Sequence, residues 1–299
     1  MAQTEEGKKP AAKAAPKGGG IKPDLATIGG IALALAGIVG GLVLERGNIQ
    51  DVIQTTAAMI VLGGTFGAVL VTTPLPVVMR AFKGLRDVFF EESSSAASII
   101  ETLIQYATKA RKNGIVSLET EAASIADPFL RKALNLAVDG TDLQELRKMM
   151  ELDIGLSEQG SEAEAKVWEA AGGYSPTIGI IGAVMGLIQV MKHLEDIKEV
   201  GHGIAVAFVA TIYGVAAANL FFLPAANKLK ARARQAALMK DMILEGVVGI
   251  VEGLNPTLIR MKLEAYNAQP KAKGAQKKGK AAEAEGKGAP AAQTASAGG

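Results

Sequence analysis

The sequence predicts an all-α integral membrane protein, and three observations support this fold class. Four apolar segments contain no Asp, Glu, Lys, Arg or His, at residues 25–44, 52–71, 174–191 and 203–223. Each is long enough, or nearly so, to cross a hydrocarbon core roughly 30 Å thick, which needs about 20 residues of helix. Basic residues flank the segments, and the polar regions between them have helical periodicity without strand–helix alternation. We therefore predict four transmembrane helices, a helical cytoplasmic domain between the second and third, and a cytoplasmic C-terminal helix.

Basic residues predict how the four spans are oriented. Lysines precede the first span, a basic group beginning at Arg80 follows the second, and another beginning at Lys228 follows the fourth. Because Lys and Arg accumulate on the cytoplasmic side, these flanks and both chain termini are predicted to be cytoplasmic. A cleaved signal peptide ending near Ala34-Leu35-Ala36 explains the pattern less well, because the apolar segment continues to Leu44.

The composition divides the chain into six parts. Both ends consist of Lys, Ala, Gly, Gln and Pro with hardly a large apolar side chain, so they are predicted to be disordered. The parts are a basic N-terminal tail (1–23), the first two spans (24–75), a cytoplasmic helical domain (76–170), the last two spans (171–224), a cytoplasmic helical region (225–267) and a C-terminal tail (268–299). Lysines of the tails are expected to lie against anionic membrane lipid.

Four helices are predicted in the two cytoplasmic regions. The first has apolar residues at helical spacing from Ile99 and ends near Asn113-Gly114, since glycine is a common C-cap. The second begins at Asp127-Pro128 and ends at Gly140. The third opens with Thr141-Asp142-Leu143-Gln144, a capping-box pattern, and continues toward Trp168 and the third span. The fourth follows Pro224, carries the apolar row Leu238, Ile243, Val247 and Ile250, and ends before Gly253-Leu254-Asn255-Pro256.

Composition excludes several classes of function. A net charge of +2 is too small for a basic nucleic-acid-binding protein, and the absence of cysteine excludes disulfides and thiolate sites. His193 and His202 lie in the short connection between the last two spans, which favours an ordinary exposed loop over a metal site or proton relay. No phosphate-binding glycine loop is present. We therefore predict no enzyme activity, no cofactor and no metal.

Small residues form a narrow seam on each of the last two spans. Pro176, Gly179, Ala183 and Gly186 follow one another at steps of three or four residues and so share one face of the third helix. On the fourth span the corresponding residues are Ala207, Thr211, Gly214 and Ala218. Small residues at this spacing allow close approach of helix backbones.

Two features of these seams each have two interpretations. Thr211 supplies the one hydroxyl on its seam, and this hydroxyl either bonds back to the carbonyl four residues earlier or faces a polar path. Pro176 and Pro224 lie near the predicted cytoplasmic ends of their spans, where proline marks either a helix end or a kink that exposes carbonyls.

Five segments carry a family resemblance. They are Ile60–Ala68, Tyr174–Leu187 and Ala205–Asn219 in the spans, and Arg111–Glu119 and Gly253–Pro256 in the cytoplasmic regions. Together they resemble the MotA/PomA family of bacterial flagellar stator subunits, over about residues 24–265. Four spans with a large loop between the second and third distinguish this family from the related three-span TolQ and ExbB proteins.

The resemblance implies a multi-pass protein of the bacterial inner membrane that serves flagellar rotation, motility and chemotaxis. Such subunits form a homo-oligomer, expected to be a pentamer, around a MotB-like single-span partner that supplies an intramembrane Asp. The complex conducts ions and converts ion-motive force into torque. By resemblance, the ion path and the partner-facing surface are formed by Thr211, Ala183, Pro176, Gly179, Gly186 and Gly214. Conformational coupling is assigned to Pro176 and Pro224.

The resemblance also implies a rotor contact and an ion. Arg111 and Glu119 correspond to residues that bind a FliG-like rotor switch protein, although each also complements a helix dipole where it stands. Asp153 is a weaker candidate for the same contact. Ala183 stands where sodium-driven relatives tend to have Thr, which favours protons, while Thr211 keeps a sodium-driven stator open. Two alternatives remain: a TolQ/ExbB-like energiser of outer-membrane processes, which the four predicted spans argue against, and a passive membrane scaffold whose glycine seams serve assembly only.

Overall fold

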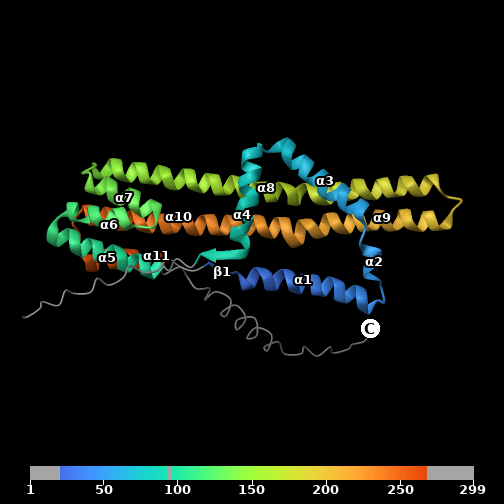
Figure 1. Ribbon diagram of the computed structural model, residues 1–299, viewed down its shortest axis with the longest axis horizontal. Coiled ribbons are helices and arrows are strands. Elements are labelled where there is room, and N and C mark those ends of the chain that lie inside the picture. The colour runs from blue at the N-terminus through green and yellow to red at the C-terminus, as the bar shows by residue number, and fades with distance from the viewer. Residues whose placement is uncertain (1–20, 93–95, 268–299) are drawn as a thin grey trace, which may run out of the picture.

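Two long antiparallel helical rods run side by side along the molecule (Figure 1). The structure, a computed structural model, describes residues 21–92 and 96–267. One rod is α8 (Leu143–Lys192), a single helix of 50 residues. The other consists of α9 (Ile197–Ala216), the π-helical turn η2 (Ala217–Phe222) and α10 (Leu223–Val251). The predicted continuation of the third cytoplasmic helix into the third span is therefore confirmed.

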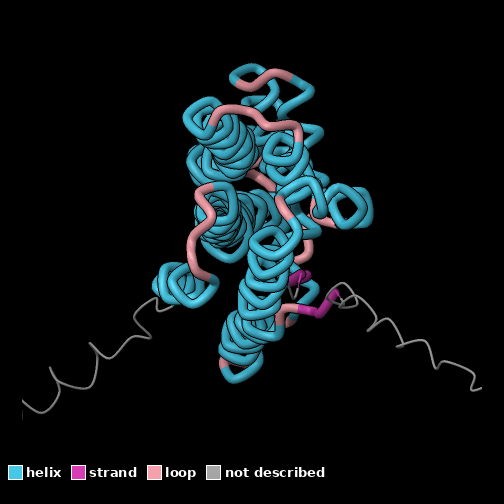
Figure 2. Tube along the Cα trace, turned by 90° about the vertical axis from the view of Figure 1, so that its left-hand side faces the viewer, coloured by secondary structure: helices cyan, strands magenta, loops and turns pink. Residues whose placement is uncertain are grey.

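A helical domain, which we call the distal domain, surrounds one end of the two rods. It contains α5 (Ala96–Asn113), η1 (Ile115–Leu118), α6 (Glu119–Ser124), α7 (Pro128–Val138) and α11 (Pro256–Asn267), packed on the ends of α8 and α10. Its core is aliphatic and includes fully buried Leu103, Leu134, Met150 and Val247. Figure 2 views the molecule from this end and shows the helices gathered around the rods.

The predicted helix ends in the distal domain are mostly confirmed. Asp127 caps α7 by accepting hydrogen bonds from the backbone N–H groups of Phe129 and Leu130, both at 2.9 Å. Gly140 and Gly253 follow the ends of α7 and α10 with φ of 75° and 69°, values that favour glycine. The capping box at the start of α8 is wrong in detail, because Asp142 is the N-cap and accepts from the N–H of Gln144 at 3.0 Å. Leu238 is 43% exposed and does not join the buried row of α10.

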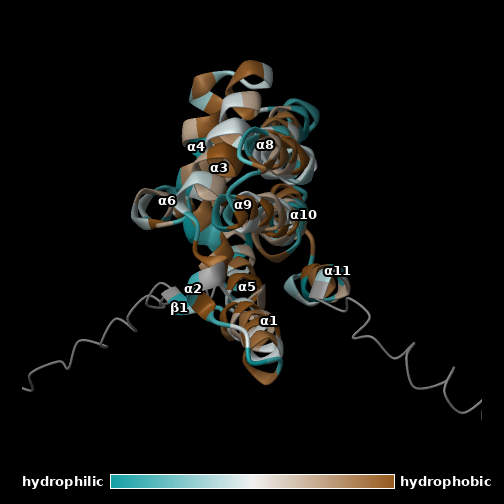
Figure 3. Ribbon diagram, turned by 90° about the vertical axis from the view of Figure 1, so that its right-hand side faces the viewer, coloured by the Kyte–Doolittle hydropathy of each residue, from teal (hydrophilic) through white to brown (hydrophobic). Residues whose placement is uncertain are grey.

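Within residues 21–92 and 96–267, four helices are long and apolar enough to cross a membrane. They are α1 (Leu25–Leu44), α3 (Thr55–Thr72), the apolar part of α8 and the apolar part of the α9–α10 rod. The short α2 (Ile49–Val52) connects α1 with α3. Figure 3 shows many hydrophobic residues in the ribbons of α1 and α3. No residue of α1 is buried, so nearly all of its apolar surface is free to contact lipid or another protein.

The helix α4 (Leu75–Phe89) lies across the two rods instead of along them (Figure 1). Trp168 of α8 is buried beneath it, and its indole N–H donates to the carbonyl of Ala81 at 3.2 Å. The ring of Phe82 packs edge-on against Trp168 at 5.0 Å between centroids. These contacts join α4 to the rods at the point where the apolar part of α8 begins.

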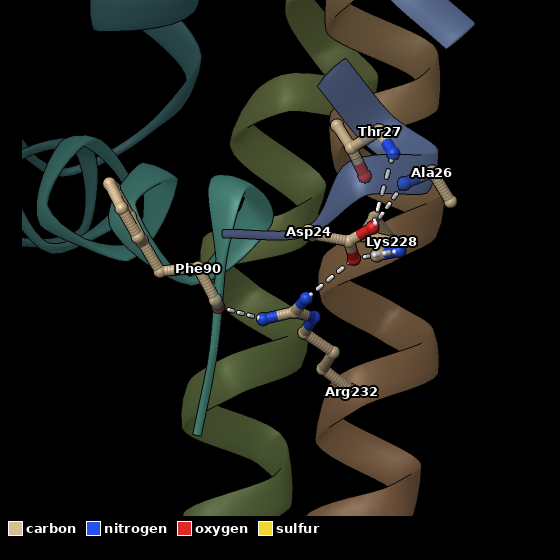
Figure 4. A network of polar contacts seen from close by, with 6 residues as sticks. All are labelled: Asp24, Ala26, Thr27, Phe90, Lys228 and Arg232. Atoms are coloured by element: carbon tan, nitrogen blue, oxygen red, sulfur yellow. Dashed lines mark hydrogen bonds and ion pairs between the residues drawn. The ribbon is translucent and has the colours of Figure 1, made fainter. Parts of the chain in front are cut away.

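A two-stranded sheet ties the start of α1 to the end of α4. Strand β1 (Ile21–Pro23) pairs antiparallel with β2 (Phe90–Glu92), with Lys22 opposite Glu91. The expectation of a disordered tail over residues 1–23 is thus wrong for residues 21–23, because backbone pairing with β2 orders them; residues 1–20 and 268–299 lie outside the described ranges. Next to the sheet, Asp24 accepts from Lys228 and Arg232 of α10, as Figure 4 shows.

Candidate functional site

Glycines form the contact between α8 and α9. A Cβ atom on Gly179 would lie 2.9 Å from the carbonyl oxygen of Ala210, and one on Gly214 would lie 2.6 Å from the carbonyl oxygen of Ser175. A Cβ on Gly186 would lie 2.9 Å from the backbone nitrogen of Ala207. These distances are shorter than ordinary carbon contacts, so the two helices approach closely only because these positions lack side chains. The two predicted seams therefore face each other within one chain.

The six residues predicted for the ion path divide into two groups. Gly179, Gly186 and Gly214 are buried in the α8–α9 contact. Pro176, Ala183 and Thr211 are half-buried at its edge. Because an α-helix turns by about 100° per residue, these three edge residues lie on the same side of the α8–α9 pair. We call this side the open edge.

Helix α3 packs on the other side of the helix pair. Its residue Ile60 lies 3.3 Å from a Cβ built on Gly182, and its Ala57 and Val61 form a buried cluster with Val209 and Ala210. The open edge therefore remains free of α3, and a further helix could pack there.

Thr211 and the two prolines have defined local structures. The hydroxyl of Thr211 donates to the carbonyl of Ala207 at 3.3 Å, so the back-bonding interpretation is confirmed. Pro176 lies inside the continuous helix α8, so the interpretation that it marks a helix end is wrong. It still interrupts the hydrogen bonding of the helix, because proline has no backbone N–H to donate. Pro224 lies in the first turn of α10 directly after the π-helical turn η2, where the helical hydrogen-bond register changes.

Three polar groups near the site were not identified from the sequence, of which Ser175 and Thr65 are buried and Tyr213 is half-buried. The hydroxyl of Ser175 donates to the carbonyl of Gly214 at 3.0 Å and links α8 to α9. The hydroxyl of Tyr213 donates to the carbonyl of Val52 at 2.7 Å, fixing the entrance to α3. Thr65 of α3 is fully buried, and its hydroxyl has no partner among the described residues. Hydroxyl residues inside apolar segments are the sequence signal that could have found them.

The charged residues predicted for a rotor contact lie on the distal domain. Arg111 is in the last turn of α5 and Glu119 is the first residue of α6; both are exposed, and neither forms an ion pair among the described residues. Arg111 also borders a cavity of about 360 Å³ lined mainly by small and aliphatic residues. Asp153 differs, because its carboxylate pairs with Lys132 at 2.6 Å. Arg111 and Glu119 are therefore available to a partner, whereas Asp153 is engaged within the chain.

The described residues contain no group of three His, Asp or Glu side chains that could hold a metal ion. The ring of His193 contacts the carbonyl of Gln189 at 3.1 Å through Nδ1, at the exposed tip of the α8–α9 hairpin. The polar groups in the membrane-capable part of the two rods include the hydroxyls of Ser175 and Thr211.

Comparison with known proteins identifies the relatives of the chain. Residues 121–242 match the MotA/TolQ/ExbB proton channel family, and residues 28–114 match Motility protein A N-terminal. Motility protein A of Helicobacter pylori is 36% identical over 84% of this chain and 97% of its own length. Chemotaxis protein PomA of Vibrio alginolyticus is 32% identical over 81% of this chain and 95% of its own.

Two solved structures have the same fold. The structure of C. jejuni MotAB superposes with a TM-score of 0.78 at 34% identity, covering 81% of this chain and 95% of that chain. The flagellar MotAB stator complex from Bacillus subtilis superposes with a TM-score of 0.73 at 32% identity, with the same coverage of each chain. Both comparisons cover almost the whole of the solved chain.

Proposed function

The chain belongs to the Motility protein A family of flagellar stator subunits, and we propose that it conducts protons with a MotB-like partner and so turns a rotor. The observation that carries this proposal is the chemistry of the spans. None of the four apolar segments contains a titratable Asp, Glu, Lys, Arg or His. A charge at the centre of a membrane helix costs roughly 2.5 to 3.5 kcal/mol. A proton path therefore needs a titratable side chain that loses its charge when it binds a proton. A single-span partner with an intramembrane Asp supplies that side chain.

The proposed topology places the distal domain in the cytoplasm. The α8–α9 hairpin tip and α2 then lie on the outer side, and both termini are cytoplasmic, as the distribution of basic residues predicts. In this arrangement the chain is a multi-pass protein of the bacterial inner membrane. The large exposed apolar surface of α1 supports contact with lipid and with further copies of the chain, in a homo-oligomer that we propose is a pentamer.

The open edge is the proposed partner-facing surface. Thr211, Ala183 and Pro176 lie along it, while Gly179, Gly186 and Gly214 support it from the α8–α9 contact behind. A partner helix here would bring its Asp near the Thr211 hydroxyl, and protonation would remove the carboxylate charge. Rotation of the subunits, or bending at Pro176 and Pro224, would follow that change of charge. No cofactor or enzyme reaction is required.

Protons are the proposed ion. Ala183 presents a methyl group on the open edge, where a hydroxyl would help to replace the hydration shell of a sodium ion. A sodium-driven stator is the second candidate, because Thr211 presents a hydroxyl on the open edge. Loss of rotation when sodium is removed at constant proton gradient would favour sodium.

Swimming and proton flux together test the proposal. The chain is expressed with its MotB-like partner in a paralysed strain, as wild type, Pro176→Leu and Thr211→Val. We expect both variants to insert normally but to lower torque and proton flux. Thr177→Val is the matched control, because Thr177 is an exposed residue of α8 about 100° round the helix from Pro176, and its hydroxyl donates to the Tyr174 carbonyl at 2.7 Å. Full torque and flux in Pro176→Leu would contradict the mechanism, and normal swimming without the chain in a strain with no other stator would contradict the function.

A further inference from the structure

Both ends of α4 are joined to ends of apolar helices. Its first residue, Leu75, is separated from the end of α3 by only Thr73 and Pro74. At its other end, the carbonyl of Phe89 accepts from the N–H of Asp24, the residue before α1, at 2.8 Å. The 15 residues of α4 extend about 22 Å at 1.5 Å per residue. Since α3 ends and α1 begins at the same membrane face, α4 must lie along that face.

One face of α4 packs on the protein. Val78, Ala81, Gly84 and Val88 are buried against the rods. A Cβ on Gly84 would lie 3.2 Å from a carboxylate oxygen of Glu164, so this face is closely packed. Val77, Leu85 and Phe89 are half-buried against the same cluster, and the remaining residues of α4 are exposed.

The outward surface of α4 carries an apolar row that is followed along the helix by two basic residues. Leu75, Met79 and Phe82 are 61%, 55% and 43% exposed, and their spacing of four and three residues places them in one row. Lys83 and Arg86 are exposed and lie four residues after Met79 and Phe82, so they border this row. Neither forms an ion pair among the described residues, whereas Arg80, further round the helix, pairs with Glu164 at 3.6 Å.

We propose that α4 is a binding site for anionic phospholipid of the cytoplasmic leaflet. The apolar row formed by Leu75, Met79 and Phe82 enters the acyl-chain boundary, and Lys83 and Arg86 bind the headgroup phosphate. This pattern suits a helix that lies in a membrane interface, where apolar burial and attraction to anionic lipid act together. A soluble partner or a second copy of the chain could cover the apolar row, but neither explains two unpaired cations at the level of the lipid headgroups. The inference rests on the proposed topology and is independent of which ion the stator uses.

The single tryptophan of the chain provides the readout. Trp168 is the only Trp in the sequence and lies directly under α4, with Phe82 between its ring and the outside. The full chain is reconstituted with its partner in vesicles that contain phosphatidylglycerol and phosphatidylcholine, one of the two brominated at a time. Bromine quenches tryptophan at short range. We expect brominated phosphatidylglycerol to quench more strongly, since two basic residues at an anionic surface correspond to about tenfold enrichment or more.

Two sets of variants decide the result. Lys83→Gln with Arg86→Gln should remove the preference for phosphatidylglycerol, whereas Arg131→Gln with Lys148→Gln, an exposed pair on the distal domain, should leave it unchanged. Moving the tryptophan into the row, by Trp168→Phe with Met79→Trp, should give stronger quenching by bromines near the headgroup than by bromines near the chain end.

Three outcomes would overturn the proposal. The first is equal quenching by the two lipids in wild type, and the second is a preference that survives in Lys83→Gln with Arg86→Gln. The third is loss of oligomers on changing these two residues, which would assign the surface to a second copy of the chain. Swimming is scored separately, so failure of lipid binding is distinguishable from failure of the stator function.

Discussion

Asp24 and Arg232 are 208 residues apart in the sequence, yet their side chains form an ion pair at 2.9 Å. Lys228 reaches the same carboxylate oxygen at 2.5 Å, and Arg232 also donates to the carbonyl of Phe90 (Figure 4). The carboxylate is only 9% exposed and also accepts from the N–H groups of Ala26 and Thr27 at the start of α1. The Asp24 side chain therefore joins the start of α1 to α10, and Arg232 extends the network to Phe90 in β2.

Replacing Asp24 by Asn should destabilise the protein by about 1–3 kcal/mol, because Lys228 and Arg232 would lose their anionic acceptor. Asp24→Arg with Arg232→Asp should recover part of the loss if the ion pair itself is responsible. Thermal unfolding of the purified chain in detergent measures both variants. An unchanged unfolding temperature in Asp24→Asn would show that the pair has no net effect.

The contribution of Asp24 should be constant from about pH 5 to pH 8. The hydrogen bond from Lys228, with further bonds from Thr27 and Arg232, holds the pKa of the carboxyl far below its usual range. A carboxyl with a lowered folded-state pKa stabilises the protein above its unfolded pKa of about 3.9 and loses this effect as pH falls through the folded value. The difference in unfolding temperature between wild type and Asp24→Asn should therefore narrow only in strong acid. Narrowing near neutral pH would contradict this assignment.

Asp241→Asn should stabilise the distal domain at neutral pH. Burial raises the pKa of Asp241, and the neighbouring carboxylates of Glu158 and Glu151 raise it further. An acid with a raised folded-state pKa destabilises the protein when it is ionised, so the advantage of Asn should shrink as pH falls through that pKa. Unfolding of wild type and Asp241→Asn, measured at neutral pH and in mild acid, tests whether the variant is the more stable and whether its advantage shrinks in acid. Glu195→Gln, at an exposed position in the α8–α9 connection, controls for removal of one negative charge.

Gly214→Ala should weaken the α8–α9 contact by about 1–3 kcal/mol, because the added methyl would meet the backbone carbonyl of Ser175. Gly173→Ala is the matched control, since a Cβ there would have no heavy atom within 4 Å. Both variants are compared by unfolding temperature and by the amount inserted in membranes. Equal unfolding temperatures and equal membrane insertion of the two variants would mean that α8 and α9 can move apart to accommodate the methyl group with little loss of stability.

Arg111→Glu should impair swimming without changing insertion or stability, because Arg111 is exposed and has no ion-pair partner among the described residues. An opposite charge reversal on the rotor partner should relieve the defect if contact is direct. Asp153→Lys distinguishes direct contact with the rotor from a general effect of charge, since this change breaks the pair with Lys132 within the chain. A rotor change that rescued Asp153→Lys as well would indicate a general effect of charge.

Local signals in the sequence predicted much of the fold. The spans were predicted by apolar length, and the cap at Asp127 and the turn at Gly140 by residue type, because each depends on neighbours within a few positions. The seams predicted close packing, but spacing alone could not tell that they face each other. The β1–β2 pair and the Asp24 network were missed, because they join segments far apart in the sequence. For the candidate site, the sequence identified Thr211 but not Ser175 or Tyr213, whose partners lie on other helices.

Because α8 is one continuous helix, a small bend at Pro176 would displace its far end. From Pro176 to its start at Leu143 the helix is about 50 Å long, so a bend of about 5° at the proline would displace Leu143 by about 4 Å. The second rod changes its hydrogen-bond register in η2, close to the same level, since a Cβ on Gly172 would meet Leu223. Regular helical hydrogen bonding is therefore interrupted at about the same level in both rods, and a small bend at that level would be magnified at the end that carries Arg111.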